Sequence, residues 1–315
     1  MHEIVSIVAP VFGLILIGWV AAKSGYVSQG SGRVVAEFAF KIAMPALLFR
    51  SMLSVGEMPG SPLMLVAAYF LAAALVWSIA TAATHLLLRR PAPDAASIAM
   101  GSTFSNSVML GVPLALSAFG PEAAAPAALL ISLDTPALWI TATLHHAIAA
   151  RTSDGPVLPR LGGVVLDLLK NPIILALVAG IVGRSTGLVV PELPDRLLQL
   201  LHNAAVPSAL CALGMSLATY EIRGQAPTLA VICILKLVLY PAVAYVLAVH
   251  VFALPPLWSA VAVLFAAMPV GANAYLFAQR YERAVGSVSS AIAVSTTIAV
   301  ASVAGVLYVL KAWIG

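Results

Sequence analysis

The chain has 315 residues, of which 62% belong to the hydrophobic set (AVILMFWYC) and 9% are charged, with a formal net charge of +4. An average soluble domain is about 25% charged, so the 16 basic and 12 acidic residues present could not cover the apolar surface of a soluble protein of this length. The composition excludes an ordinary soluble enzyme, a disordered protein and a nucleic-acid binder, since the basic residues are scattered between apolar runs. Cys211 and Cys233 lie inside apolar segments and indicate neither a disulfide framework nor a metal motif.

Ten apolar segments, each long enough to cross a bilayer at about 20 residues, follow one another along the chain. Their connections are short, and the longest hydrophilic stretch, residues 151–160, is expected to be a surface loop between two halves because it carries Gly155, Pro156 and Pro159. We therefore predict an all-α integral membrane protein with ten transmembrane helices. The predicted spans are Ile4–Ala22, Val34–Leu53, Leu63–Leu88, Ala95–Phe119, Ala124–Ala149, Gly163–Gly183, Leu197–Thr219, Thr228–Phe252, Leu257–Arg280 and Val288–Leu310.

The two sides of the predicted membrane protein carry unequal numbers of basic residues. Nine Lys and Arg residues lie in the loops after odd-numbered helices, four lie on the other side, and three fall inside spans. Cytoplasmic loops are enriched in Lys and Arg, so this bias predicts a plasma (cell inner) membrane protein with both termini on the non-cytoplasmic side.

An internal repeat is indicated by a proline in the second helix of each half, Pro45 and Pro207. These two prolines are 162 residues apart. Shifting the sequence by 162 residues places predicted helices three, four and five on predicted helices of the second half. Direct identity is weak, with three matches in twelve positions between Ile42–Leu53 and Ala204–Met215, so two unrelated sets of five helices remain the alternative. Five helices is an odd number, which predicts an inverted repeat, as in many secondary transporters. The repeats are residues 1–150 and 163–315, with 151–162 as a cytoplasmic linker.

The fourth and ninth predicted helices each contain helix-breaking residues near mid-membrane. Asn and Ser compete for backbone hydrogen bonds, Gly loosens the chain and Pro removes a donor. A broken helix is tolerated in a bilayer only beside a cavity or inside protein, where half-helix N-termini can hold an anion and freed carbonyls a cation. The alternative is a purely structural role, in which the two prolines only kink their helices and neighbouring helices satisfy the freed backbone groups. The residues concerned are Asn106, Ser107, Gly111 and Pro113 in the fourth helix, and Pro269, Gly271, Asn273 and Tyr275 in the ninth.

Three of the charged residues that fall within predicted spans are candidates for a functional role. Asp134 lies near the middle of helix five, where an ionised carboxylate costs about 2.5–3.5 kcal/mol unless a proton, a cation, a lysine or water compensates it. Asp134 is therefore the first candidate for proton or cation coupling, and a carboxyl bonded to backbone freed by Pro136 is the alternative. Lys41, one turn before Pro45, could face a carboxylate substrate or snorkel to an interface. Lys236 is equally open to a structural role.

The motifs together resemble the auxin efflux carrier family, which includes plant PIN auxin exporters and malonate-type transporters. The resemblance implies a scaffold of helices one, two, six and seven, and a transport domain of helices three to five and eight to ten with an X-shaped crossing of helices four and nine. The plan is also similar to bile acid:sodium symporters, but those carry an acidic residue at the ninth-helix crossing where this chain has Asn273. The segments that carry the resemblance are Pro10–Tyr26, Phe40–Phe49, Ser105–Pro113, Met268–Tyr281 and Ser295–Thr297.

The sequence thus predicts a secondary active transporter or facilitator that moves a small organic anion, a carboxylate, by an elevator mechanism. The anion would bind Asn106 and Asn273, with no cofactor and no metal, and with a proton or sodium ion as the candidate coupling ion. Partners would be the substrate, the bilayer and a second copy of the chain through the scaffold helices. A sodium-coupled symporter and a passive anion channel are the alternatives, and no enzyme motif is recognised. The predicted site residues are Asn106, Ser107, Gly111, Pro113, Pro269, Asn273, Tyr275, Pro45 and Pro207 for the substrate, with Asp134 and Lys41 for coupling.

Overall fold

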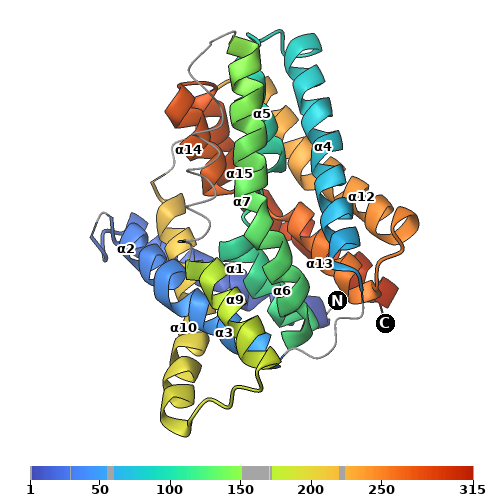
Figure 1. Ribbon diagram of the computed structural model, residues 1–315. Coiled ribbons are helices and arrows are strands. Elements are labelled where there is room, and N and C mark those ends of the chain that lie inside the picture. Colours follow the sequence, from blue (N-terminus) through green and yellow to red (C-terminus); the bar gives the residue numbers. More distant parts are fainter. Residues whose placement is uncertain are drawn as a thin grey trace. The chain divides into compact units, whose positions relative to one another are not determined.

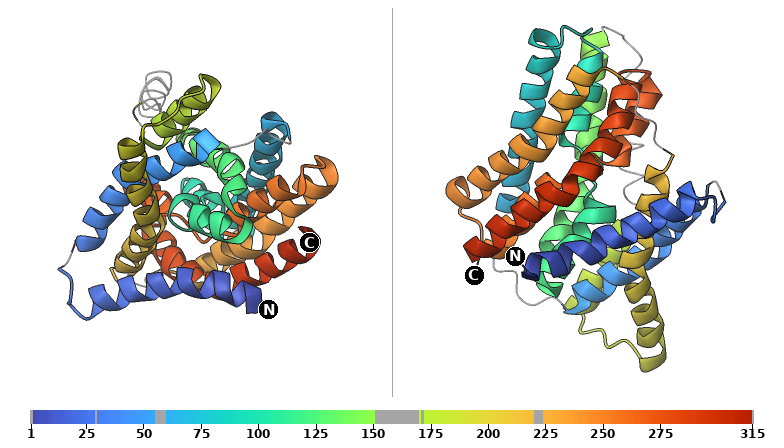
Figure 2. Two further views of the ribbon diagram at one scale, coloured as in Figure 1. Left: turned by 90° about the horizontal axis from the view of Figure 1, so that it is seen from below. Right: turned by 180° about the vertical axis from the view of Figure 1, so that it is seen from behind.

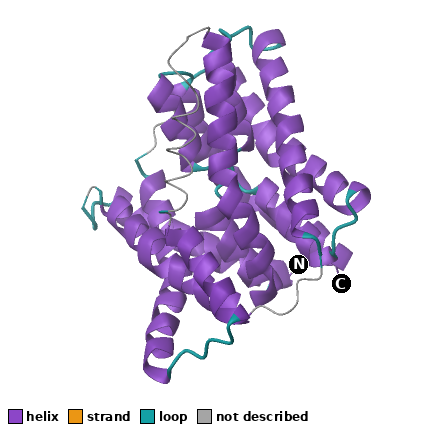
Figure 3. Cartoon of the chain, viewed as in Figure 1, coloured by secondary structure: helices purple, strands orange, loops and turns teal. Residues whose placement is uncertain are grey.

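The computed structural model describes residues 2–28, 30–54, 60–150, 170, 172–219 and 224–314. Within these residues the chain is helical apart from loops and one isolated antiparallel bridge between Ser105 and Val270 (Figure 3). The predicted linker 151–162 and the start of the sixth predicted span lie outside the described residues. The chain divides into two compact units. The first unit is residues 1–59, 108–128 and 166–219, and the second unit is residues 60–107, 129–165 and 220–315.

In the first unit, α10 packs against α1, α2 and α3, and α9 packs against α3 (Figure 1). Small residues let membrane helices approach closely. A Cβ atom at Gly18 of α1 would overlap the carbonyl of Cys211, and one at Gly214 of α10 would overlap the carbonyl of Ile15. The elements are α1 (His2–Lys23), α2 (Ser31–Phe38), η1 (Ala39–Ala43), α3 (Met44–Ser54), α6 (Val112–Phe119), η3 (Pro121–Ala123), α9 (Pro172–Ser185) and α10 (Glu192–Leu217).

The second unit is built around two short, deeply buried helices, α5 and α13. Every residue of α5 is buried, and so is every residue of α13 from Trp258 onward, because α4, α11, α12, α14 and α15 pack around them. In the right-hand view of Figure 2, α15 runs beside α11. The elements are α4 (Pro62–Leu86), α5 (Asp94–Thr103), α11 (Ala226–Ile234), η4 (Leu235–Leu239), α12 (Tyr240–Tyr245), η5 (Val246–Val251), α13 (Pro256–Ala267), α14 (Ala272–Tyr281) and α15 (Val285–Ile314). The division between the units cuts η2 (Ser107–Gly111) after its first residue and α7 (Ala124–Ala150) after Ala128.

Three of the four described π-helical segments end two residues before a proline, namely Pro45, Pro113 and Pro241. A proline lacks the N–H group and its ring collides with the carbonyl four residues earlier, and a wider π turn relieves both problems. These prolines therefore continue their helices. The prediction that Gly111 and Pro113 belong to the interruption of the fourth helix is wrong in position, because the interruption lies earlier, at residues 104–106.

Among the described residues, six helices are long and apolar enough to cross a membrane, and three shorter apolar helices accompany them. The predicted fourth and ninth spans are each divided into two shorter pieces, whereas the predicted second span is one continuous helical run, Ser31–Ser54. The six long helices are Ile4–Lys23, Pro62–Leu86, Pro121–Ala150, Glu192–Leu217, Ala226–Val251 and Val285–Ile314.

Candidate functional site: a crossing of two broken helices

Two helix interruptions meet inside the second unit, and together they form what we call the crossing, residues 104–106 and 268–271. The backbone N–H of Asn106 donates to the carbonyl of Pro269 at 2.8 Å, and the N–H of Gly271 donates to the carbonyl of Phe104 at 3.0 Å. Ser105 and Val270 form the antiparallel bridge between these bonds. Unpaired backbone groups are costly in a membrane, so each interruption satisfies groups that the other leaves free.

Gly271 allows the two non-helical segments of the crossing, residues 104–106 and 268–271, to approach each other closely. A Cβ atom at this position would lie 2.7 Å from Cδ1 of Phe104 and 2.8 Å from the carbonyl oxygen of Ser105. The backbone of Gly271 is extended, with φ −84° and ψ 153°, so any residue could adopt its conformation. Glycine is therefore required at position 271 because there is no room for a Cβ atom, and not because of its backbone conformation.

Lys236 links the two interruptions through its side chain. It lies in η4, is 0% exposed, and its Nζ donates to Oγ of Ser105 and to the carbonyl of Ala266, each at 2.7 Å. A second side chain also binds the crossing: Oγ of Ser295 in α15 accepts a hydrogen bond from the backbone N–H of Val270 at 3.0 Å. Sequence reasoning gave Lys236 no preferred role, although an ionisable residue within a membrane span is a functional candidate by default.

Asp134 of α7 is buried beside this lysine, at 3% exposure. Its carboxylate interacts electrostatically with Lys236 and lies near the hydroxyl of Tyr69. Four buried side-chain oxygen atoms lie together in this region: Oδ1 of Asp134, Oγ of Ser107 and the hydroxyls of Tyr69 and Tyr240. The second unit therefore contains a buried cluster of polar side chains beside the crossing.

The remaining predicted site residues are divided between the units. In the second unit, Asn106 is 8% exposed within the crossing, and Asn273 and Tyr275 lie half-buried in α14, directly after it. Lys41 belongs to the first unit, where its side chain is 67% exposed and its Nζ lies 3.8 Å from Oε2 of Glu37. The structure thus gathers Asn106, Ser107, Asp134, Pro269, Asn273 and Tyr275 in the second unit, and it locates Lys41, Pro45, Gly111, Pro113 and Pro207 in the first.

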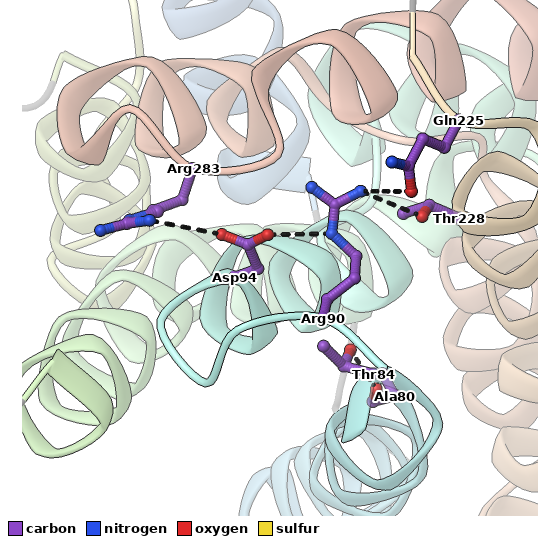
Figure 4. A network of polar contacts seen from close by, with 7 residues as sticks. All are labelled: Ala80, Thr84, Arg90, Asp94, Gln225, Thr228 and Arg283. Atoms are coloured by element: carbon purple, nitrogen blue, oxygen red, sulfur yellow. Dashed lines mark hydrogen bonds and ion pairs between the residues drawn. The ribbon is translucent and has the colours of Figure 1, made fainter. Parts of the chain in front are cut away.

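A second polar network lies at one end of the second unit (Figure 4). Nε of Arg90 lies 2.9 Å from Oδ2 of Asp94, whose side chain is only 7% exposed, and NH1 of Arg283 lies 3.9 Å from its other oxygen. NH1 of Arg90 also donates to Gln225 at 3.2 Å and to Thr228 at 3.3 Å. The network ties the α4–α5 loop and the α14–α15 loop to the start of α11.

The long apolar helices define a multi-pass integral membrane protein, and its polar crossing is buried within one unit. The chain belongs to the membrane transport protein family, whose profile matches residues 3–160 and 157–307. The predicted membership of the auxin efflux carrier type of family is confirmed. The chain therefore has a transport role and not an enzymatic one.

Two relatives are similar along almost their whole length. A protein of Rhizobium meliloti (strain 1021) described as "Putative malonate transporter" is 29% identical over 99% of this chain and 97% of its own length. An uncharacterized transporter of Methanocaldococcus jannaschii is 22% identical over 92% of this chain and 94% of its own length.

Proposed function

We propose that the protein is a secondary transporter or facilitator of a small organic anion, and that the anion's carboxylate binds at the crossing. The observation that carries the proposal is the pairing of the two interruptions, since one helix begins directly after each of them. The run η2–α6 begins at Ser107 and α14 begins at Ala272. The first N–H groups of a helix have no partner within that helix, and the helix dipole adds partial positive charge there.

The side chains at these helix starts suit a carboxylate. Asn106 and Asn273 can each donate an amide N–H, and neither brings a negative charge that would repel the substrate. At the start of α14, Ala272 is exposed and Asn273 is half-buried, which supports a ligand contact at this helix start. The relative described as a malonate transporter supports a dicarboxylate as the substrate class.

We further propose ten membrane helices in two inverted repeats and an elevator mechanism. In this view helices one, two, six and seven form the scaffold, in which Pro45 and Pro207 face the substrate path, and the scaffold carries the dimer contact. The second unit carries the substrate, which agrees with the presence of the whole crossing in that unit. Asp134 is the proposed proton acceptor for coupling, and Lys41 is proposed to attract the anion. The basic-residue bias supports a plasma-membrane location with both termini outside.

Uptake and counterflow of radiolabelled malonate in proteoliposomes test the substrate site. Asn106→Ala and Asn273→Ala should each lower the initial rate at least about tenfold, the effect of one charge-assisted hydrogen bond. Asn203→Ala is the matched control because Asn203 is an exposed residue of α10 in the first unit. Wild-type rates in both Asn106→Ala and Asn273→Ala would show that the anion does not bind at the crossing and the helix start that follows it.

Counterflow also separates a carrier from a channel. A carrier saturates and accelerates labelled uptake when unlabelled substrate is inside the vesicle, whereas a passive anion channel does neither. An imposed pH gradient that changes accumulation in the wild type, and not in Asp134→Asn, would support proton coupling at Asp134.

A further inference from the structure

The strongest unassigned feature of the protein is a group of histidines at one end of the second unit, where α4 and α7 both end (Figure 1, Figure 2). His145 and His146 lie half-buried in the last two turns of α7, and His85 lies exposed in the last turn of α4. Successive residues of an α-helix point about 100° apart around its axis. The two adjacent histidines of α7 therefore face different neighbours.

His145 faces α4 and binds the indole of a buried tryptophan. Nε1 of Trp77, a residue that is 8% exposed, donates to Nδ1 of His145 at 3.1 Å. An indole N–H can only donate, so Nδ1 carries no proton and the imidazole is neutral, with its proton on Nε2. A protonated imidazole has an N–H at both nitrogens and cannot accept this bond. The hydrogen bond between α4 and α7 therefore exists only while His145 is neutral.

His146 faces α14 and belongs to an aromatic row between α7 and α14, which consists of Trp139, Phe277, Tyr281 and His146. The ring centroids of His146 and Tyr281 are 4.2 Å apart, those of Tyr281 and Phe277 are 4.7 Å apart, and those of Phe277 and Trp139 are 5.5 Å apart. Residues seven apart on α7 and four apart on α14 share one face of each helix, so the rings meet as a continuous row. The aromatic row holds α14, the helix whose start is the proposed anion site, against α7.

The titratable and charged side chains around His145 come from three helices. They are His85 of α4, His146 of α7 and Tyr281 of α14, with Arg280 and Glu282 on either side of Tyr281. The two histidines interact with His145 electrostatically. Protonation would put like charges on these neighbouring imidazoles, so acid would replace a neutral, hydrogen-bonded cluster with groups that repel one another.

We infer that the hydrogen bond from Trp77 to His145 is a pH-sensitive latch: neutral His145 ties α7 to α4, and protonation of His145 releases α7 together with the aromatic row that holds α14. The ordinary pKa of a histidine is about 6.5, so the two states are compared at about pH 7.5 and about pH 5.5. A second part of the inference is that acid thereby slows anion exchange. That part rests on the proposed function, and the latch itself does not.

Tryptophan resonances test the latch directly. The chain has five tryptophans, so purified protein labelled with ¹⁵N on its indoles gives few signals, and Trp77→Phe identifies the one of interest. The Trp77 indole N–H signal of the wild type should shift upfield between about pH 7.5 and about pH 5.5, because it loses its acceptor.

Two variants show whether His145 causes this shift. His145→Asn should abolish the shift, since an asparagine oxygen takes the position of Nδ1 and does not titrate. His250→Asn is the matched control and should shift like the wild type, because His250 is an exposed histidine of η5. A wild-type signal that does not move, or a shift that persists in His145→Asn, would overturn the inference.

Thermal unfolding gives a second test that does not depend on the folding of His145→Asn. Trp77→Phe keeps an aromatic ring and removes the donor, so it has no hydrogen bond to lose in acid. Over the same pH change, the Tm of the wild type should fall by about 2–4 °C more than that of Trp77→Phe, the effect of one hydrogen bond. All other groups titrate in both proteins, so the difference isolates the latch. Equal falls in Tm would contradict it.

Counterflow of malonate in proteoliposomes, with the same pH on both sides, tests the transport part. From about pH 7.5 to about pH 5.5, the wild-type rate should fall by a factor that is about threefold or more greater than the factor for His145→Asn. Acid also protonates part of the malonate, and the comparison of the two proteins cancels that effect. Equal factors would overturn the transport part. Absence of exchange at every pH, together with the expected tryptophan shift, would refute the proposed function and leave the latch standing.

Discussion

The substitution Gly271→Ala adds one methyl group and should push apart the two non-helical segments of the crossing. The Cβ atom of Gly271→Ala would lie 2.8 Å from the carbonyl oxygen of Ser105, about 0.6 Å inside the 3.4 Å at which ordinary contact begins, and 2.7 Å from the ring of Phe104. Overpacking of this kind costs about 1–3 kcal/mol. Lengthening the 3.0 Å bond from the Gly271 N–H to the Phe104 carbonyl adds about 1 kcal/mol. We expect a loss of about 2–4 kcal/mol.

Thermal unfolding in detergent measures this loss. One kcal/mol shifts Tm by about 2–4 °C for an unfolding unit of about 150–250 residues, so Gly271→Ala should lower Tm by at least about 4 °C. Gly305→Ala is the matched control, because Gly305 lies on the exposed side of α15 with nothing within 4 Å of its Cβ position. This control should be neutral or slightly stabilising, since alanine favours helix more than glycine does. A Gly271→Ala protein that unfolds at the wild-type temperature would refute the close packing of the crossing.

Two further predictions concern the packing and charge of each unit. Gly214→Ala would place a methyl group against the carbonyl of Ile15, so it should lower Tm clearly more than Gly13→Ala, whose Cβ position has nothing within 4 Å. Arg90→Ala leaves the buried Asp94 without its close partner and should cost about 2–4 kcal/mol. Arg283→Ala should cost about 1 kcal/mol or less, since its side chain is 43% exposed and lies 3.9 Å from Asp94. Equal losses for the two arginine variants in thermal unfolding would contradict this ranking.

The two helix interruptions of the candidate site could be predicted from residue types alone. Asn106 and Pro269 were expected at interrupted helices, because a chain with so few polar residues has little reason to combine Asn, Ser, Gly and Pro within a span unless the helix is interrupted. The positions were less accurate. Gly111 and Pro113 lie in a continuous helical run, since a π turn can accommodate a proline and the sequence does not state how the preceding turn is wound.

The role of Lys236 shows what the sequence could not supply. Ser105, Ala266 and Lys236 are far apart in the chain, and the periodicity of a helix does not reveal which partner a buried ammonium group meets. The same is true of Gly271, whose lack of a side chain matters only because Phe104 and Ser105 lie against it.

Composition and the length of the apolar segments were sufficient to identify an integral membrane protein. The hydrocarbon core of a bilayer accepts only a backbone whose polar groups are paired internally and side chains that are mostly apolar. Only the tertiary structure decided which polar groups pair with each other at the crossing, where the helix interruptions leave backbone N–H and carbonyl groups without partners in their own helices. The energy of a buried polar contact depends on distances between segments remote in sequence, and those distances are fixed by the packing of α5, α13 and η4 within one unit.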